Sequence, residues 1–169
     1  MYTWIFYSTF VSNMKTVLLL VGKTANKHFQ AGMTDYESRL VHYMPFSVSV
    51  IPEIKNTRSL SSEQQKQKEG ELILKSLSPS DTLILLDEKG MEFTSVDFAS
   101  WLTKQQQGSR RLVFCIGGPY GFSKDVYDRA NGKISLSRMT FSHQMVRLIF
   151  MEQLYRACTI MNNEPYHHE

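Results

Sequence analysis

Short apolar runs alternate with helix-like segments along the chain, and this alternation constrains the fold more than any other feature. The runs TLILL (82–86) and LVFCI (112–116) are continuous rather than alternating. Continuous apolar strands are buried on both faces, which is typical of parallel sheets covered by helices. Strands are predicted at about 15–21, 46–53, 82–90, 110–118 and 133–137, and helices at about 26–43, 61–77, 95–108, 123–130 and 142–161. The sequence therefore predicts an α/β fold, a parallel sheet with helices on both faces.

Capping residues support several of the predicted helix starts. The segment SSEQ at 61–64 fits a capping box, in which a serine and a glutamine satisfy free backbone N–H groups at a helix start. Thr94 or Ser95 can cap the next helix, Gly108 suits its end, and Ser123 can cap a short fourth helix. The stretch 55–60 is polar and is predicted to be a loop.

Length and composition indicate one ordinary globular domain. The chain has 169 residues, of which 42% are hydrophobic and 21% charged, and its net charge of +3 permits an anionic partner without demanding one. Cys115 and Cys158 each lie in an apolar run, which favours buried free thiols and a reducing cytosol, and the sequence gives no zinc signal. We predict a domain at 14–169 preceded by an N-terminal extension at 1–13 that makes a poor signal peptide, and no apolar run approaches a membrane span of ~18 residues.

The segment FCIGGPYGFS (114–123) places glycines directly after a strand, which usually means that the backbone approaches something closely. The spacing G-G-x-x-G is not the dinucleotide fingerprint G-x-G-x-x-G, which argues against a Rossmann-type oxidoreductase. VGKT at 21–24 resembles the end of a phosphate-binding loop, but Val17 stands where that motif needs glycine. We expect an ordinary turn there.

Two further segments are expected beside the glycines, because ligands of open parallel sheets bind at the carboxyl ends of strands. LLDEKG (85–90) ends the third strand, so Asp87 and Glu88 are either pocket residues or solvated turn residues. SLSRMTFSHQ (135–144) leaves the fifth strand; its backbone could satisfy the polar edge of a ligand while Met139 and Phe141 supply apolar walls, or it is an ordinary loop.

The last predicted helix, 142–161, is apolar over most of its circumference, so we expect it to be buried on more than one side. One side suits the chain's own sheet and the other a second subunit, although a central helix of a monomer gives the same pattern. His143 and Arg147 lie four apart on one face, and Arg156 can pair with Glu152. This face is either a surface salt-bridge face or a strip that meets RNA phosphate.

Three segments together resemble one small bacterial enzyme family: VFCIGGPYGFS, ISLSRMTFSHQMVRLIFMEQLYRA and the tail PYHHE. The chain is similar from Met14 to Glu169 to the 23S rRNA pseudouridine N3-methyltransferases of the SPOUT superfamily. The resemblance implies a C-terminal trefoil knot, a homodimer through the last helix, and S-adenosylmethionine as cofactor. It also implies that the substrate is the loop of helix 69 on the assembled 70S ribosome in the cytoplasm, with neither DNA nor a membrane as partner and no metal.

The resemblance also assigns roles to residues. The implied cofactor-binding residues are Leu86, Gly117, Leu136, Ser137, Arg138, Met139, Thr140 and Phe141. His167 is implied as the catalytic base, with Tyr166 orienting the substrate across the dimer and His143 as the competing base. Candidate RNA contacts are Arg147, His143 and His168. The family usually has proline at Ser142 and a basic residue at His168, so this chain departs at both positions.

Two alternatives to this reaction stay open at the level of sequence. The chain could methylate another RNA nucleotide, because nothing in the sequence reads out a base. It could instead be a ribosome-binding module that has kept the fold and lost catalysis, although the complete glycine loop and the Tyr166-His167 pair argue against this.

Overall fold

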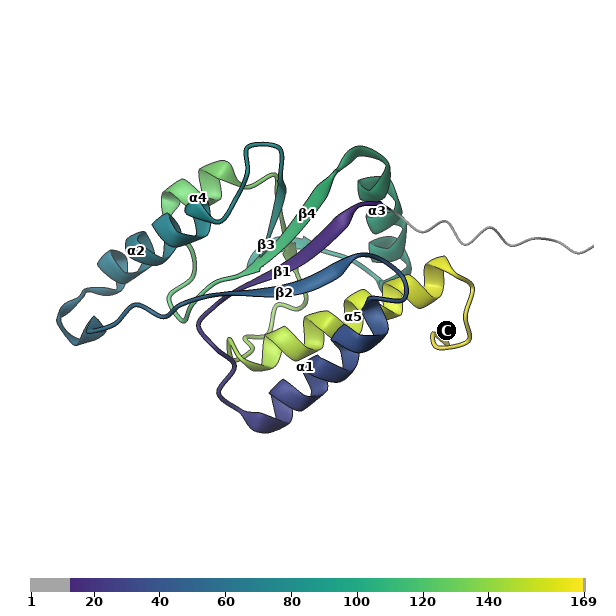
Figure 1. The fold of residues 1–169 in the computed structure, drawn as a ribbon, viewed down its shortest axis with the longest axis horizontal. Helices are drawn as coiled ribbons and strands as arrows, with labels where there is room; N and C mark the ends of the chain where they lie inside the picture. Colours follow the sequence, from purple (N-terminus) through teal and green to yellow (C-terminus); the bar gives the residue numbers. More distant parts are fainter. Residues whose placement is uncertain (1–12, 169) are drawn as a thin grey trace, which may run out of the picture.

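The predicted parallel sheet is confirmed in a computed structural model that describes residues 13–168 (Figure 1). The five strands all pair in parallel, in the order β2-β1-β4-β3-β5. They are β1 (Lys15–Val21), β2 (Phe46–Ile51), β3 (Thr82–Glu92), β4 (Arg111–Ile116) and β5 (Gly132–Ser135). The expected N-terminal extension falls almost wholly outside the described residues.

Helices cover both faces of the sheet, as the continuous apolar strands predicted. They are α1 (Lys27–Leu40), α2 (Ser62–Lys75), α3 (Ser95–Gly108), α4 (Lys124–Arg129) and α5 (Met145–Met161), with a short 3-10 turn, η1 (Thr57–Ser59). In Figure 1, α1, α3 and α5 lie on one side of the strands and α2 and α4 on the other. Alternate residues of β1 point to opposite faces of the sheet. Leu18 and Leu20 pack in the core beneath α1, α3 and α5, and Val17 and Leu19 pack in the core beneath α2 and α4.

The helix ends agree with most of the capping predictions. Ser61 and Gln64 form the predicted capping box, and the Thr94 side chain accepts a hydrogen bond from the backbone of Asp97. Helix α5 begins three residues later than predicted, and the Ser142 hydroxyl accepts a hydrogen bond from Met145 N. Ser123 precedes α4 as predicted, but its hydroxyl makes no cap hydrogen bond and is buried without a partner.

Strand β3 continues past its predicted end and breaks its pairing where the site forms. Leu86 pairs with Ile134 of β5, and Met91 pairs with the same residue, so the four residues between them leave the ladder. This irregularity turns residues 87–90 out at the carboxyl end of the sheet. It places the segment LLDEKG beside the ends of β4 and β5, as the strand order requires.

Helix α5 packs against α1, α3 and the sheet of its own chain. These neighbours account for much of its all-round apolar pattern, so that pattern does not require a second subunit. Cys158 on α5 and Cys115 on β4 are buried free thiols, as predicted. Within residues 13–168, no helix is long and apolar enough to cross a bilayer.

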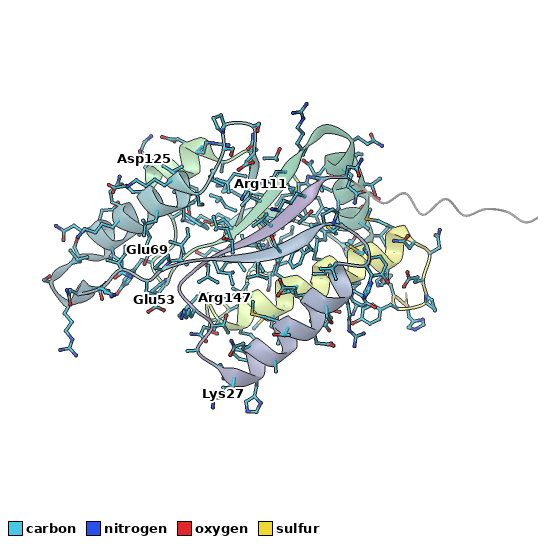
Figure 2. The ribbon with its side chains drawn as sticks, viewed as in Figure 1. Lys27, Glu53, Glu69, Arg111, Asp125 and Arg147 are labelled. Atoms are coloured by element: carbon cyan, nitrogen blue, oxygen red, sulfur yellow. The ribbon has the colours of Figure 1, made fainter. Side chains whose placement is uncertain are left out.

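Arg147 lies in the interior and corrects the prediction that its helix face meets solvent or RNA (Figure 2). Its side chain is 0% exposed and donates hydrogen bonds to Val21 O (2.7 Å), Gly22 O (2.9 Å), Thr24 Oγ1 (3.0 Å) and His143 O (3.0 Å). Burial lowers the pKa of this guanidinium. Arg147 therefore joins the end of β1 to the start of α5, and its burial does not fit a contact with RNA phosphate.

Candidate functional site

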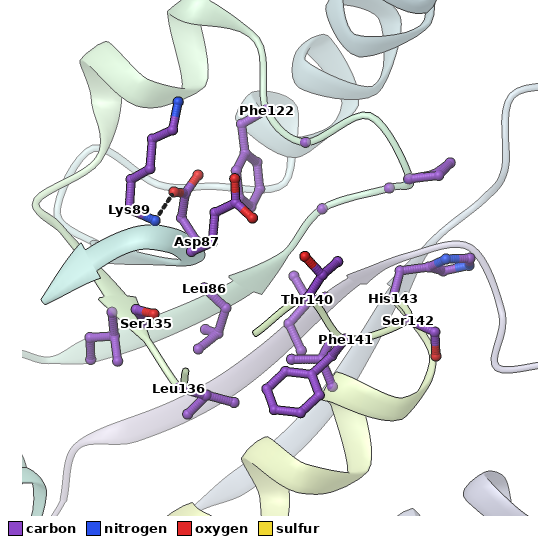
Figure 3. A pocket seen from close by; sticks show the side chains of 18 of the residues that line it. Leu86, Asp87, Lys89, Phe122, Ser135, Leu136, Thr140, Phe141, Ser142 and His143 are labelled. Carbon is purple, nitrogen blue, oxygen red and sulfur yellow. Dashed lines mark hydrogen bonds between the residues drawn. The ribbon is translucent and has the colours of Figure 1, made fainter. Parts of the chain in front are cut away.

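A cavity of about 590 Å³ opens at the carboxyl ends of β3, β4 and β5 (Figure 3). Three segments that the sequence singled out form its walls. The segment at the end of β3 contributes Leu86, Asp87, Glu88 and Lys89. The glycine loop after β4 contributes residues 116–122, and the segment of β5 and beyond contributes 134–137 and 139–143, with Tyr127 and Val146 also at the wall. The predicted shared pocket is therefore confirmed, and its volume lies within the range of small-molecule sites.

The glycine loop forms one wall, and the neighbouring side chains explain its glycines. A side chain at Gly117 would press on the Phe122 ring, 3.1 Å from the position of a Cβ atom. A side chain at Gly118 would overlap the carboxyl group of Glu69 on α2, whose carbon lies 3.0 Å from that position. Gly121 has φ +80°, in the region that favours glycine. The loop backbone thus forms the cavity wall without intervening side chains at 117 and 118.

The segment after β5 forms the opposite wall and is held by its own hydrogen bonds. Ser135 Oγ donates to Ser137 O, and Met139 N donates to Ser137 Oγ, both at 3.0 Å. Farther along, Gln144 Oε1 accepts hydrogen bonds from the backbone of Ala25 and Asn26, at the start of α1. The wall therefore combines fixed backbone polar groups with the apolar side chains of the segment.

Asp87 is a structured pocket residue rather than a solvated turn residue. One of its carboxylate oxygens accepts a hydrogen bond from Lys89 N (2.8 Å), drawn as a dashed line in Figure 3, and the other accepts one from the Tyr127 hydroxyl. Burial, and then this hydrogen bond, raise the pKa of Tyr127, so it remains a donor at neutral pH. This pair fixes the first turn of the β3 segment against α4.

Of the eight residues expected to bind the cofactor, seven line the cavity: Leu86, Gly117, Leu136, Ser137, Met139, Thr140 and Phe141. Arg138 does not line it. The Arg138 side chain is 89% exposed and forms a 3.3 Å ion pair with Glu92. A role for Arg138 in holding a ligand inside this cavity is not supported by that placement.

The candidate histidines lie at opposite ends of α5. His143 lines the cavity at the helix start (Figure 3), whereas Tyr166, His167 and His168 follow the helix end and do not line it. Tyr166 packs on Tyr155 with ring centroids 4.9 Å apart and donates a hydrogen bond to Glu152 (3.2 Å).

The residues around Tyr166 fix both its position and its protonation. The Arg156 guanidinium lies 4.8 Å from the Tyr166 ring centroid and pairs with Glu152, as the sequence predicted. Its Nη1 also lies 3.5 Å from His167 Nδ1. A hydrogen bond with Tyr36, then burial and Glu152, raise the pKa of Tyr166. Tyr166 is therefore suited to donate a hydrogen bond rather than to accept a proton.

Sequence reasoning missed Glu69 and gave no role to Tyr120. Glu69 lies in the middle of a helix whose pattern indicates only an ordinary amphipathic segment; its neighbour Gly70 was the available signal. Gly70 allows α2 to approach α4 so closely that an added side chain would strike the Ser123 hydroxyl. Tyr120, 53% exposed, lies at the cavity between the glycines of the loop.

Comparison with known proteins identifies the family. The family model described as "Predicted SPOUT methyltransferase" matches residues 14–167. Similar curated proteins include the "Ribosomal RNA large subunit methyltransferase H" of Phocaeicola vulgatus and that of Parabacteroides distasonis, each 60% identical over 157 residues, covering 92% of this chain and 100% of the relative. That of Flavobacterium johnsoniae is 57% identical with the same coverage. Because the family model spans nearly the whole described domain, this chain belongs to the SPOUT methyltransferase family.

Proposed function

We propose that this chain is an S-adenosylmethionine-dependent methyltransferase that modifies N3 of a pseudouridine in the helix 69 loop of 23S rRNA, on the assembled ribosome in the cytoplasm. The observation that carries the proposal is the cavity, where seven of the eight expected cofactor residues meet. Relatives named as large-subunit rRNA methyltransferases, 57–60% identical over their whole length, support the substrate class.

The cavity residues fit the proposed cofactor. Its volume of about 590 Å³ accommodates a nucleoside with an amino-acid arm, and Leu86, Leu136 and Phe141 offer apolar walls to an adenine ring. The bare backbone at Gly117 and Gly118 allows close approach. When bound, S-adenosylmethionine would supply a reactive methyl group on a positively charged sulfur. We further propose the trefoil knot of the family for the C-terminal part of the chain, which supplies two of the cavity walls.

The protein must align the target base and accept one proton. The N3–H of pseudouridine lies between two carbonyl groups and is weakly acidic, and it must be lost before the nitrogen can attack. Imidazole is the side chain best suited to take up a proton near neutral pH. His143 is at the cavity, and His167 is at the tail. We propose His167 as the base and Tyr166 as the residue that orients the substrate.

This assignment requires a second copy of the chain. The tail turns back along α5 only as far as Glu152, which lies about 10 Å from the start of the helix at 1.5 Å per residue, and Tyr166 and His167 do not line the cavity of their own chain. A tail held against Glu152, Tyr155 and Arg156, outside its own cavity, is placed to act on the cavity of a partner. We therefore propose a homodimer in which α5 lies at the interface and each tail completes the other subunit's site.

Recognition of the ribosome is proposed to rely on shape and on a few contacts at the cavity mouth. With a net charge of +3 the chain offers few phosphate contacts, which suits a large preformed particle better than a short RNA. His143 and His168 are exposed and remain candidate RNA contacts, whereas buried Arg147 is not one.

The experiment that tests this proposal is nucleoside mass spectrometry. Ribosomes that lack this methylation are incubated with the purified protein and S-adenosylmethionine, and the digested rRNA is compared with a reaction lacking protein. A new methyl group on N3 of a pseudouridine is the expected result. Methylation of a different nucleotide would overturn the target, and cofactor binding with no methylation of any ribosomal nucleotide would favour the binding-module alternative.

A further inference from the structure

A buried carboxylate lies directly behind the glycine loop. Glu69 on α2 is 4% exposed, and one of its oxygens accepts a hydrogen bond from Gln65 Nε2 (2.8 Å). Its other oxygen, Oε2, is buried and makes no hydrogen bond. Within residues 13–168, no basic side chain forms an ion pair with Glu69. A buried carboxylate without a counter-charge is costly, so its presence calls for a physical reason.

The unpartnered oxygen points at the wall of the cavity. Glu69 Oε2 is the atom nearest to the position that a Gly118 side chain would take, and Gly118 itself lines the cavity. A single residue of backbone therefore separates the carboxylate from the cavity. Two glycines make this arrangement possible: Gly118 leaves room for the carboxyl group, and Gly70 brings α2 close to Ser123 at the start of α4.

The charges around Glu69 do not neutralise it. Burial is the main cause that raises its pKa, and Glu53 raises it further. Gln65 and His143 lower it, Gln65 through its hydrogen bond and His143 through its charge across the carboxyl end of the sheet. Figure 2 shows Glu53 and Glu69 at this same end of the molecule. Ser123, just before α4, lies against the neighbouring Gly70 and offers only a neutral hydroxyl. A cation in the cavity would supply the charge that these neighbours do not.

We propose that the Glu69 carboxylate is the counter-charge for a cationic ligand in this cavity and that it selects S-adenosylmethionine over S-adenosylhomocysteine. The inference rests on the proposed function. The two compounds differ by one methyl group and one positive charge at sulfur, so a fixed negative charge behind the wall favours the first by electrostatic attraction. Such selection also helps the demethylated product to leave.

The test compares binding of the two compounds to the wild type and to Glu69→Gln by isothermal titration calorimetry. Glutamine keeps the size of the side chain and an oxygen for Gln65 but removes the charge. We expect the Kd for S-adenosylmethionine to rise about tenfold in the variant while the Kd for S-adenosylhomocysteine changes less than twofold. Glu71→Gln, which removes an exposed charge from the same helix, is the control and should change neither Kd.

Two outcomes would overturn the proposed role of Glu69. Equal weakening of both compounds would overturn the proposal, because Glu69 would then act only by shaping the loop. Unchanged binding of both would overturn it as well. Circular dichroism of Glu69→Gln shows whether the variant is folded. Glu69→Asp keeps the charge on a shorter side chain, so it should retain part of the selectivity for S-adenosylmethionine that Glu69→Gln loses. If the wild type binds neither compound, the proposed function itself fails.

Discussion

Replacing Arg147 by methionine tests whether this residue serves the fold or the RNA. The Arg147 side chain donates four hydrogen bonds. The two shortest go to the backbone oxygens of Val21 and Gly22, at the buried end of β1. Arg147→Met keeps most of the side-chain volume but leaves both carbonyls without a donor. A buried polar group left unpaired costs about 1–3 kcal/mol, so the two cost about 2–6 kcal/mol together.

A second effect reduces that figure. Within residues 13–168 the guanidinium forms no ion pair, and burial lowers its pKa although the charge of Glu53 raises it, so its charge is destabilised there. Removing it relieves this cost. We therefore expect Arg147→Met to lower the free energy of unfolding by about 2–4 kcal/mol. Lysine at this position should lose nearly as much, because one ammonium group cannot span the same four acceptors.

Urea unfolding followed by circular dichroism measures this change, with Arg138→Met as the matched control. Arg138 is 89% exposed and makes only a surface ion pair with Glu92, so its loss should change stability by less than about 0.5 kcal/mol. The reasoning would be refuted if Arg147→Met were as stable as the wild type and had lost only its affinity for ribosomes. That result would restore the RNA-contact role that the sequence suggested.

Three further predictions concern the cavity and its surroundings. An exposed tyrosine ring at the cavity mouth is suited to stack on a base, so Tyr120→Ala should raise the KM for ribosomes about tenfold with the cofactor Kd unchanged. Tyr120→Trp should retain activity. If the hydroxyl group mattered instead, Tyr120→Phe would be as poor as Tyr120→Ala. Co-expressed Gly118→Val and His167→Ala chains, each inactive alone, should together recover roughly a quarter of wild-type activity, because about half of the dimers are mixed and each mixed dimer has one intact site of two. No recovery would mean that tail and cavity do not act across subunits. The raised pKa of Glu69 means that the folded protein binds the carboxyl proton more tightly than the unfolded chain. The free energy of unfolding should therefore fall as pH rises from the ordinary glutamate range through the folded pKa. Urea titrations of Glu69→Gln should lack this pH dependence, and an equal dependence in both proteins would contradict the assignment.

The sheet and its helices could be predicted from the sequence because buried strands and helices carry recognisable patterns of apolar residues. Continuous apolar runs marked β3 and β4, and the end of each run marked where the cavity would form. The exact strand ends could not be predicted, since they depend on pairing. Glu92 counts as strand only because Ser135 of β5 lies beside it after the break at Leu86. No local pattern contains that information.

The candidate site could be predicted as a set of loops but not as a set of contacts. The spacing of His143 and Arg147 predicted one shared helix face, and this was wrong. His143 precedes α5 and is exposed at the cavity, whereas Arg147 is buried and bonds only the backbone oxygen of His143. Spacing along a helix does not say whether that face meets water or the end of a strand 126 residues away, where Val21 O accepts its hydrogen bond. Arginine is so seldom fully buried that a surface position was the reasonable expectation. Only the three-dimensional neighbours decide such a case.

Glycines after a strand are usually taken as evidence of a ligand, and this loop shows a second cause. A side chain at Gly117 would crowd Phe122, and one at Gly118 would overlap the Glu69 carboxyl group, on the protein side of the wall and before any ligand is considered. The two causes are linked, because a wall one backbone thick brings whatever lies behind it within electrostatic reach of the cavity. Glycine at 118 therefore leaves room for the Glu69 carboxylate behind the wall and, in the proposed function, for a ligand in front of it. A loop of this kind can recognise charge through its backbone, without any charged side chain of its own.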